Sequence, residues 1–131
     1  MIISFEPSEA VRNLSYLKQD GLVIVNADPV KPTTESLHET GYDGTDMIEY
    51  LQKKCQVLAV DGQQLCAEFG SSKYLNVILL GVAAGSGVLD IPKEAIQKEI
   101  RVRVPSKFVE NNRLAFEKGY AFASGQAQTA K

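Results

Sequence analysis

Short runs of consecutive apolar residues recur along the first half of the chain, separated by amphipathic or polar stretches. These runs are MIISFEP (residues 1–7), LVIVN (22–26) and CQVLAVD (55–61). Continuous rather than alternating apolar positions are typical of strands covered on both faces, as in a parallel sheet. The pattern therefore predicts three buried, parallel strands.

The segments between these runs have helical spacing. PSEAVRNLSYLKQDG (7–21) places apolar residues on one face, with Pro7 suited to a first turn and Gly21 to the position after the last turn. TDMIEYLQKK (45–54) and GQQLCAEFG (62–70) are shorter helical segments, and the polar, proline-containing connection before the second helix predicts an extended surface segment. Alternation of strand and helix predicts an α/β fold, with three α/β/α layers around a mainly parallel sheet.

The last part of the chain is expected to be largely helical. DIPKEAIQKEIRVRV (90–104) places Ile91, Ala95, Ile96 and Ile100 on one side of a helix. SKFVENNRLAFEKGY (106–120) follows as a second helix with an aromatic face. The small, polar segment 121–131 is expected to be a flexible tail after a single domain over residues 1–120.

The stretch YLNVILLGVAAGSGVL (74–89) allows two interpretations. As a strand that ends in a glycine turn it has the spacing of a dinucleotide-binding loop, but such a loop must start a helix of some length. Asp90 and Pro92 follow too soon, because proline belongs near the start of a new helix. We therefore predict a buried helix in which Gly81 and Gly85 allow a neighbour to approach closely and Gly87 ends the helix.

Composition limits the possible functions. The 131 residues carry a net charge of −2 with acidic and basic residues interspersed, so no electrostatic footprint for nucleic acid is visible. The longest apolar run, residues 77–89, is shorter than the roughly 20 residues of a membrane span. Cys55 and Cys66 stand without a CxxC motif or a secretory leader, which favours reduced thiols and a cytoplasmic location.

Three asparagines in apolar surroundings are candidate ligand contacts. Asn26 ends a predicted parallel strand, at the edge where open α/β sheets bind ligands. Asn76 and Asn112 lie among apolar residues of predicted helices, where an amide needs hydrogen-bond partners. Asn26 either contacts a ligand or forms a structural turn. Asn76 and Asn112 each either tie loop backbone to the core or reach a ligand or a subunit interface. His38 has no assignable nucleophile beside it and is expected to be solvated, and no catalytic or metal-binding residue is assigned.

Basic residues gather in RVRVPSK (101–107), around Pro105. A solvated helix end explains this cluster, and a site for an anionic group such as the phosphate of a partner-bound cofactor is the alternative.

The combined strings YLKQDGLVIVNADPVKP (16–32), VLAVDGQQLCAEFGSSKYLNVILLGVAAGSGVLDIPKEAI (57–96) and RVPSKFVENNRLAFEKGY (103–120) resemble the gamma-type domain of the 2-oxoacid:ferredoxin oxidoreductases. Within that family, the VPxKFVExNxxAFExGY ending (104–120) makes the likeness nearest to the beta subunit of indolepyruvate:ferredoxin oxidoreductase. The resemblance covers about residues 2–120. Family members begin with a further strand and a glycine-rich GxGGQG turn, so this chain looks like the C-terminal part of such a subunit.

The resemblance implies a role in a complex. In the family, thiamine diphosphate attacks the 2-oxoacid, electrons pass through iron–sulfur clusters to ferredoxin, and the acyl group leaves on coenzyme A. In the indolepyruvate branch the thiamine, magnesium and cluster sites belong to a large alpha-type subunit, so this chain alone is expected to bind no cofactor and to be inactive. A missing first strand would leave a sheet edge and apolar surface for a partner or a second copy to cover.

Two other functions remain open at this point. The chain could be an independent nucleotide-binding, dehydrogenase-like domain that uses GVAAGSG (81–87), or an oligomerisation module. Binding of a nicotinamide cofactor would favour the first, and self-association without a ligand effect would favour the second.

Overall fold

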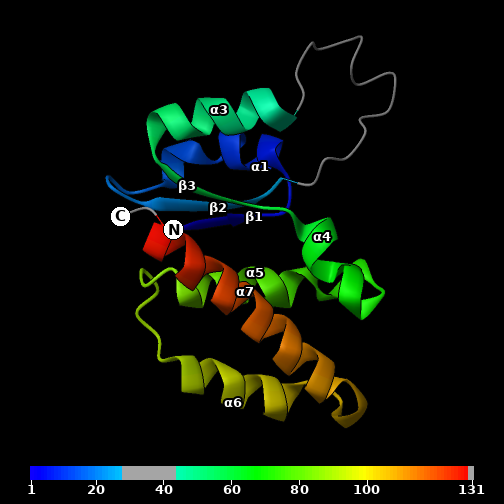
Figure 1. The fold of residues 1–131 in the computed structure, drawn as a ribbon. Coiled ribbons are helices and arrows are strands. Elements are labelled where there is room, and N and C mark those ends of the chain that lie inside the picture. The colour runs from blue at the N-terminus through cyan, green and yellow to red at the C-terminus, as the bar shows by residue number, and fades with distance from the viewer. Residues whose placement is uncertain (28–43, 130–131) are drawn as a thin grey trace. The chain divides into compact units, whose positions relative to one another are not determined.

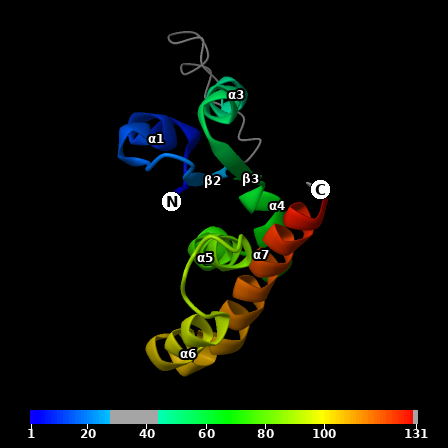
Figure 2. The same ribbon diagram turned by 90° about the vertical axis from the view of Figure 1, so that its left-hand side faces the viewer.

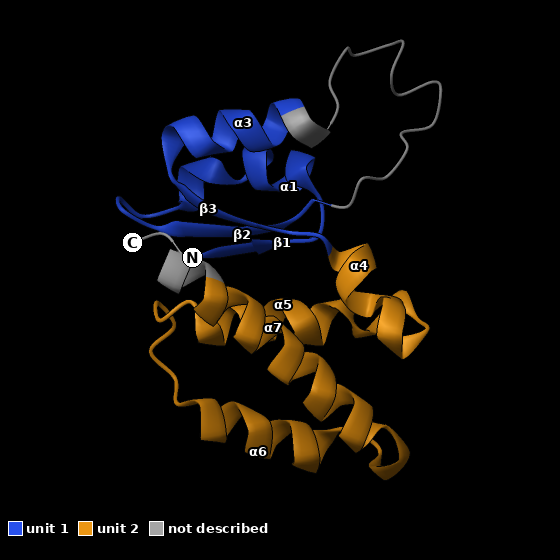
Figure 3. Cartoon of the chain, viewed as in Figure 1, with its two compact units in different colours: residues 1–61 blue, residues 62–131 orange. Residues whose placement is uncertain are grey.

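The computed structural model of the chain describes residues 1–27 and 44–129 and forms two compact units, Met1–Asp61 and Gly62–Lys131 (Figures 1 and 3). Unit 1 contains β1 (Ile2–Ser4), α1 (Pro7–Arg12), β2 (Leu22–Asn26), α3 (Gly44–Lys54) and β3 (Gln56–Val60). Unit 2 contains α4 (Gly62–Cys66), α5 (Leu75–Gly85), α6 (Lys93–Arg103) and α7 (Val109–Thr129). Short 3₁₀ turns precede or follow several of these helices, at Leu14–Tyr16, Ala67–Phe69, Ser72–Tyr74 and Ser106–Phe108.

The sheet of unit 1 is parallel, in the order β1-β2-β3. The central strand β2 is buried at every position, which explains its unbroken run of apolar residues. Strands β1 and β3 depart from the prediction of three buried strands, because Ile3 of β1 and Gln56 and Ala59 of β3 are exposed. Among the described residues each of these two strands pairs with β2 alone, so each lies at an end of the sheet, where fewer neighbouring side chains cover it.

Helices α1 and α3 cover one face of the sheet. Ala10 of α1 and Leu51 of α3 pack on Val23 and Val25 of β2, and all four side chains are fully buried. Helix α1 is shorter than its pattern predicts, since it ends at Arg12 and the chain continues through a 3₁₀ turn. Gly21 was predicted to follow the last turn of this helix. The residue with left-handed backbone before β2 is instead Asp20, with φ of 64°.

The glycine stretch is helical, as predicted, and forms α5. Ser71 precedes it, and its hydroxyl accepts a hydrogen bond from the backbone N–H of Lys73 at 3.2 Å. Helix α5 ends at Gly85, and Gly87, which was predicted to end it, lies two residues later with φ of 80°. The α/β class, with a parallel sheet and a largely helical C-terminal part, is thus confirmed.

Helices α5 and α7 run side by side at close range (Figures 1 and 2). A Cβ atom on Gly81 would collide with the carbonyl oxygen of Phe116, and one on Gly119 would collide with that of Ile78. The predicted close approach at Gly81 and Gly85 is therefore present, and Gly119 on the facing helix completes it. Backbone-to-backbone contact of this kind requires residues without side chains on both helices.

Two predictions for the last helices need correction. Helix α6 begins after Pro92 and buries Ile96 and Ile100, whereas Ile91 lies before the helix with 49% of its surface exposed and Ala95 is exposed on it. Helix α7 continues to Thr129 where a flexible tail from residue 121 was expected. Ala123 in this part is buried. The small residues there make a helical packing surface.

Candidate functional site

Two polar residues are buried in the part of the chain that the structure describes, and both lie at the carboxyl end of the parallel sheet of unit 1. These are Ser4 at the end of β1 and Asn26 at the end of β2, with 5% and 6% of their surfaces exposed. The register that pairs Ser4 with Val25 places the two on adjacent strands at the same edge. Asp61 follows β3 at this edge. Ligands of open α/β folds bind at the carboxyl edge, which makes it the first candidate site.

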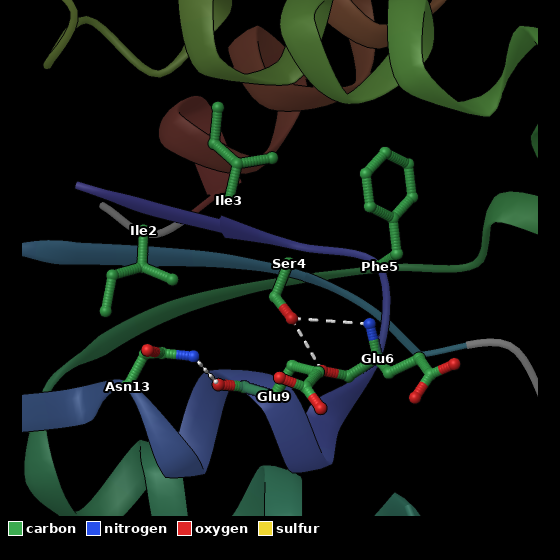
Figure 4. A pocket seen from close by; sticks show the side chains of 7 residues that line it. All are labelled: Ile2, Ile3, Ser4, Phe5, Glu6, Glu9 and Asn13. Atoms are coloured by element: carbon green, nitrogen blue, oxygen red, sulfur yellow. Dashed lines mark hydrogen bonds between the residues drawn. The ribbon is translucent and has the colours of Figure 1, made fainter.

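The polar groups at this edge are used within the fold. The Ser4 hydroxyl donates to the carbonyl oxygen of Glu6 at 2.6 Å and accepts from the Glu6 N–H at 3.3 Å, which turns the chain from β1 into α1 (Figure 4). The Ala27 N–H donates to the carbonyl oxygen of Val60 at 2.7 Å and extends the pairing of β2 with β3. Neither Asn26 nor Asp61 is without a partner. Sequence reasoning found Asn26 but missed Ser4 and Asp61, although each follows an apolar run directly.

The other two asparagines belong to unit 2. Asn112 of α7 is half-buried, and its amide nitrogen donates to the carbonyl oxygen of Phe108 at 2.8 Å. Asn76 at the start of α5 is exposed, and its side-chain oxygen accepts from the N–H of Val77 at 2.9 Å. Asn112 therefore ties loop backbone to a helix. Asn76 does not tie loop backbone to a helix, because its side chain is exposed and binds only the N–H of the next residue.

Two of the open pockets formed by described residues lie in unit 1. One, of about 580 Å³, lies along β1 and the start of α1 (Figure 4). The other, of about 530 Å³, lies between the turn after α1 and the end of α3, and Lys18, Lys53 and Cys55 are among its lining residues. Burial raises the pKa of the Cys55 thiol above its ordinary value, and the thiol donates to the Leu51 carbonyl oxygen at 3.4 Å. A protonated, hydrogen-bonded thiol is a poor nucleophile at neutral pH.

Charged side chains of unit 2 form ion pairs both along one helix and between helical elements. Arg103 binds Glu99 at 2.6 Å, so part of the basic cluster in residues 101–107 is neutralised. Glu110 binds Arg113 at 2.6 Å, and this hydrogen bond lowers the pKa of the Glu110 carboxyl. The Lys73 Nζ atom lies 4.5 Å from the centre of the Phe108 ring. The Lys107 Nζ atom lies 5.0 Å from the centre of the same ring. Nothing in the sequence spacing could have predicted that Lys73 approaches this cluster.

Within residues 1–27 and 44–129, no group of three or more His, Cys, Asp or Glu side chains is placed to hold a metal ion. His38 lies outside these described residues. The described helices are too short or too polar to cross a membrane.

Comparison with known proteins gives the family. The model of the pyruvate ferredoxin/flavodoxin oxidoreductase family matches residues 1–122. The chain belongs to this family. It is 34% identical over 122 residues to an "Indolepyruvate oxidoreductase subunit IorB" of Thermococcus kodakarensis and equally to one of Pyrococcus horikoshii, covering 91% of this chain and 60% of each relative.

A solved structure supports the same assignment. The crystal structure of the gamma subunit of a keto/oxoacid ferredoxin oxidoreductase from Geobacter sulfurreducens matches with a TM-score of 0.68 and 25% identity, over 94% of this chain and 63% of that chain. The chain therefore spans about three-fifths of the length of its pyruvate ferredoxin/flavodoxin oxidoreductase relatives. The predicted resemblance to the family is confirmed.

The family implies thiamine and iron–sulfur chemistry, and the cysteines of this chain do not fit an iron–sulfur cluster. An iron–sulfur cluster needs about four thiolate ligands, whereas this chain has two cysteines. Cys55 is in unit 1 with its thiol bonded to backbone, and Cys66 is buried in unit 2 among Tyr74 and Ile78. No reaction step is therefore assigned to a cofactor on this chain.

Proposed function

We propose that this protein is a subunit of a thiamine-dependent 2-oxoacid:ferredoxin oxidoreductase that acts on arylpyruvates. The observation that carries the proposal is the family match over residues 1–122 together with the two relatives named as indolepyruvate oxidoreductase subunits. The reaction would be the oxidative decarboxylation of an arylpyruvate to an aryl-acetyl-CoA, with loss of carbon dioxide and transfer of the electrons to ferredoxin.

The chemistry would belong to a partner, a large alpha-type subunit that holds thiamine diphosphate, magnesium and iron–sulfur clusters. Three features support this division of work. The buried Ser4 hydroxyl at the sheet edge binds backbone, burial raises the pKa of the Cys55 thiol and so keeps it protonated, and the cysteine count is too small for a cluster. This chain would complete the assembly, and by itself it would be inactive.

Exposed side chains of unit 2 are the part of this chain most suited to meet coenzyme A or the partner. Lys73 and Lys107 flank the Phe108 ring, and neither forms an ion pair within 4.0 Å among the described residues. An ammonium group without a nearby carboxylate can attract a phosphate or a carboxylate of another molecule. A cytoplasmic location would suit the reduced thiols and the ferredoxin acceptor.

The association test uses a candidate alpha-type subunit from the same organism. The two chains are co-expressed without oxygen, purified through a tag on this chain, and examined by sedimentation at micromolar concentration. We expect a stable complex whose thiamine and iron stay with the alpha-type chain after the two are separated. Failure to associate, or cofactor retained by this chain, would contradict the proposal.

An independent dehydrogenase-like role has lost its structural basis. The glycines of residues 81–87 would have to form a turn that wraps a pyrophosphate, and Gly81 and Gly85 instead lie inside α5 against α7. A thermal-shift measurement with NADH, NADPH and coenzyme A checks this directly, because a ligand that binds the folded chain raises its melting temperature. We expect no shift with either nicotinamide cofactor.

A further inference from the structure

Positive charge is concentrated where the chain passes from α6 into α7 (Figure 1). Residues 101–107 contain Arg101, Arg103 and Lys107 and no acidic residue, although the whole chain has a net charge of −2. Arg103 binds Glu99 at 2.6 Å. Arg101 and Lys107 form no ion pair within 4.0 Å among the residues that the structure describes. These two cations are therefore available to a molecule outside the chain.

Lys73, in the turn before α5, adds a third cation to this stretch. Its Nζ atom lies 4.5 Å from the centre of the Phe108 ring, and the Lys107 Nζ atom lies 5.0 Å from the same centre. The side-chain amide of Asn111 donates to the Tyr74 hydroxyl at 3.3 Å, which ties this turn to the first turn of α7. The fold thus holds two ammonium groups beside one aromatic ring, whose face attracts cations.

The acidic side chains that border these cations along the chain are paired with other residues. Glu99 binds Arg103, and Glu110 binds Arg113 at 2.6 Å. Lys73 forms no ion pair in the described part of the chain. Like charges held close together repel each other, and carboxylates from another molecule would replace this repulsion with attraction.

An exposed apolar side chain indicates what kind of molecule binds there. Val102 stands between the two arginines in the sequence and has 69% of its surface exposed, and Phe108 is half-buried. A free phosphate would leave Val102 in contact with water. A protein surface that places an apolar side chain among carboxylates would cover Val102 and bind the cations together, as the apolar centre and polar rim of an interface do.

We propose that Lys73, Arg101, Val102, Lys107 and Phe108, which we call the basic surface, bind an acidic surface of the alpha-type subunit. This inference rests on the proposed function, because that function supplies the partner. Aspartate and glutamate side chains of the partner bind the three cations, and an apolar side chain among them covers Val102. Ion pairs at the rim of an interface mainly speed association, and salt weakens them.

Chemical cross-linking tests the contact. This chain and a candidate alpha-type subunit from the same organism are purified as a complex and treated with a carbodiimide, which joins an amine to a carboxylate in contact with it. We expect mass spectrometry to find Lys73 or Lys107 joined to aspartate or glutamate of the alpha-type subunit. A complex in which neither lysine is joined to the partner would overturn the basic surface and leave the proposed function standing. Failure to form a complex would overturn both.

Removal of the three charges measures their contribution. The triple variant Lys73→Gln, Arg101→Gln and Lys107→Gln should weaken the complex about tenfold at about 0.05 M salt and make its affinity less dependent on salt. The three side chains are exposed, so the variant should keep the melting temperature of the parent. Unchanged affinity in the triple variant would overturn the proposal.

A second triple variant controls for net charge. It removes three exposed lysines of unit 1 that form no ion pair within the described residues. The substitutions are Lys18→Gln, Lys53→Gln and Lys54→Gln. We expect this variant to bind the alpha-type subunit within about twofold of the parent. Equal weakening by the two triple variants would mean that net charge alone matters, and it would overturn the assignment to the basic surface.

A lipid surface is the alternative occupant, because anionic headgroups attract cations and the bilayer accepts an apolar side chain. The chain alone is sedimented with phosphatidylserine vesicles. We expect it to stay in the supernatant. Binding to the vesicles that the first triple variant abolishes would assign the basic surface to a membrane, and it would overturn the proposed occupant.

Discussion

At the scale of single residues, glycines set the distance between α5 and α7. A Cβ on Gly81 would collide with the carbonyl oxygen of Phe116 and lie 3.0 Å from the carbonyl carbon. The obstacle is backbone, so no side-chain rotation relieves it and the helices must separate. Gly125, further along α7, has nothing within 4 Å of such a Cβ.

We expect Gly81→Ala to lower the free energy of unfolding by about 1 to 3 kcal/mol, the usual cost of overpacking a close contact. Gly125→Ala is the control and should raise it by up to about 1 kcal/mol, because alanine is the better helix former. Urea denaturation followed by far-ultraviolet circular dichroism measures both. Equal effects at the two positions would contradict the close packing of α5 on α7.

At the scale of elements, the sequence was informative wherever a periodic pattern ran without interruption. The positions of the three strands and of the helix over residues 75–85 were predicted correctly, because continuous apolar runs and the early Pro92 allow few alternatives, whereas full burial was found only for β2. The face of α6 was partly wrong. Pro92 forms its N-cap, so Ile91 precedes the helix and cannot share its buried side with Ile96 and Ile100.

Pairs between distant segments were beyond sequence reasoning. The contact of Gly119 with Ile78 and the approach of Lys73 to Phe108 depend on how α5 and α7 pack. Segment 121–131 was expected to be a flexible tail because its residues are small and polar, and its described part belongs to α7 as far as Thr129. Small residues also pack closely, and Ala123 is buried in α7.

The asparagine candidates differ in their expected effects on helix stability. Asn112→Ala removes a half-buried hydrogen bond to the Phe108 carbonyl, whereas Asn76→Ala removes a bond to the adjacent N–H at an exposed position. Both gain the same helix propensity, so their difference isolates the half-buried bond. We expect Asn112→Ala to be less stable than Asn76→Ala by about 1 kcal/mol, measured by urea denaturation. A more destabilising Asn76→Ala would contradict the structural role of Asn112.

At the scale of the whole molecule, the family could be identified from the sequence, while the candidate site could be predicted only in part. Asn26 was placed correctly at the carboxyl end of a parallel strand. The strand order could not be predicted, and it places β1 and β3 at the two ends of the described sheet, each paired with β2 alone. A sequence pattern gives the faces of a strand but not its position within the sheet.

The central claim is that this chain serves a 2-oxoacid:ferredoxin oxidoreductase whose chemistry is carried by a partner. The most direct test is dye reduction by reconstituted components without oxygen, with indolepyruvate and coenzyme A as substrates and a viologen as electron acceptor. The alpha-type subunit and this chain are each assayed alone and then together. We predict that reduction requires this chain together with the alpha-type subunit, and that this chain alone gives none. Full activity of the alpha-type subunit by itself, or no activity in any combination, would contradict the claim.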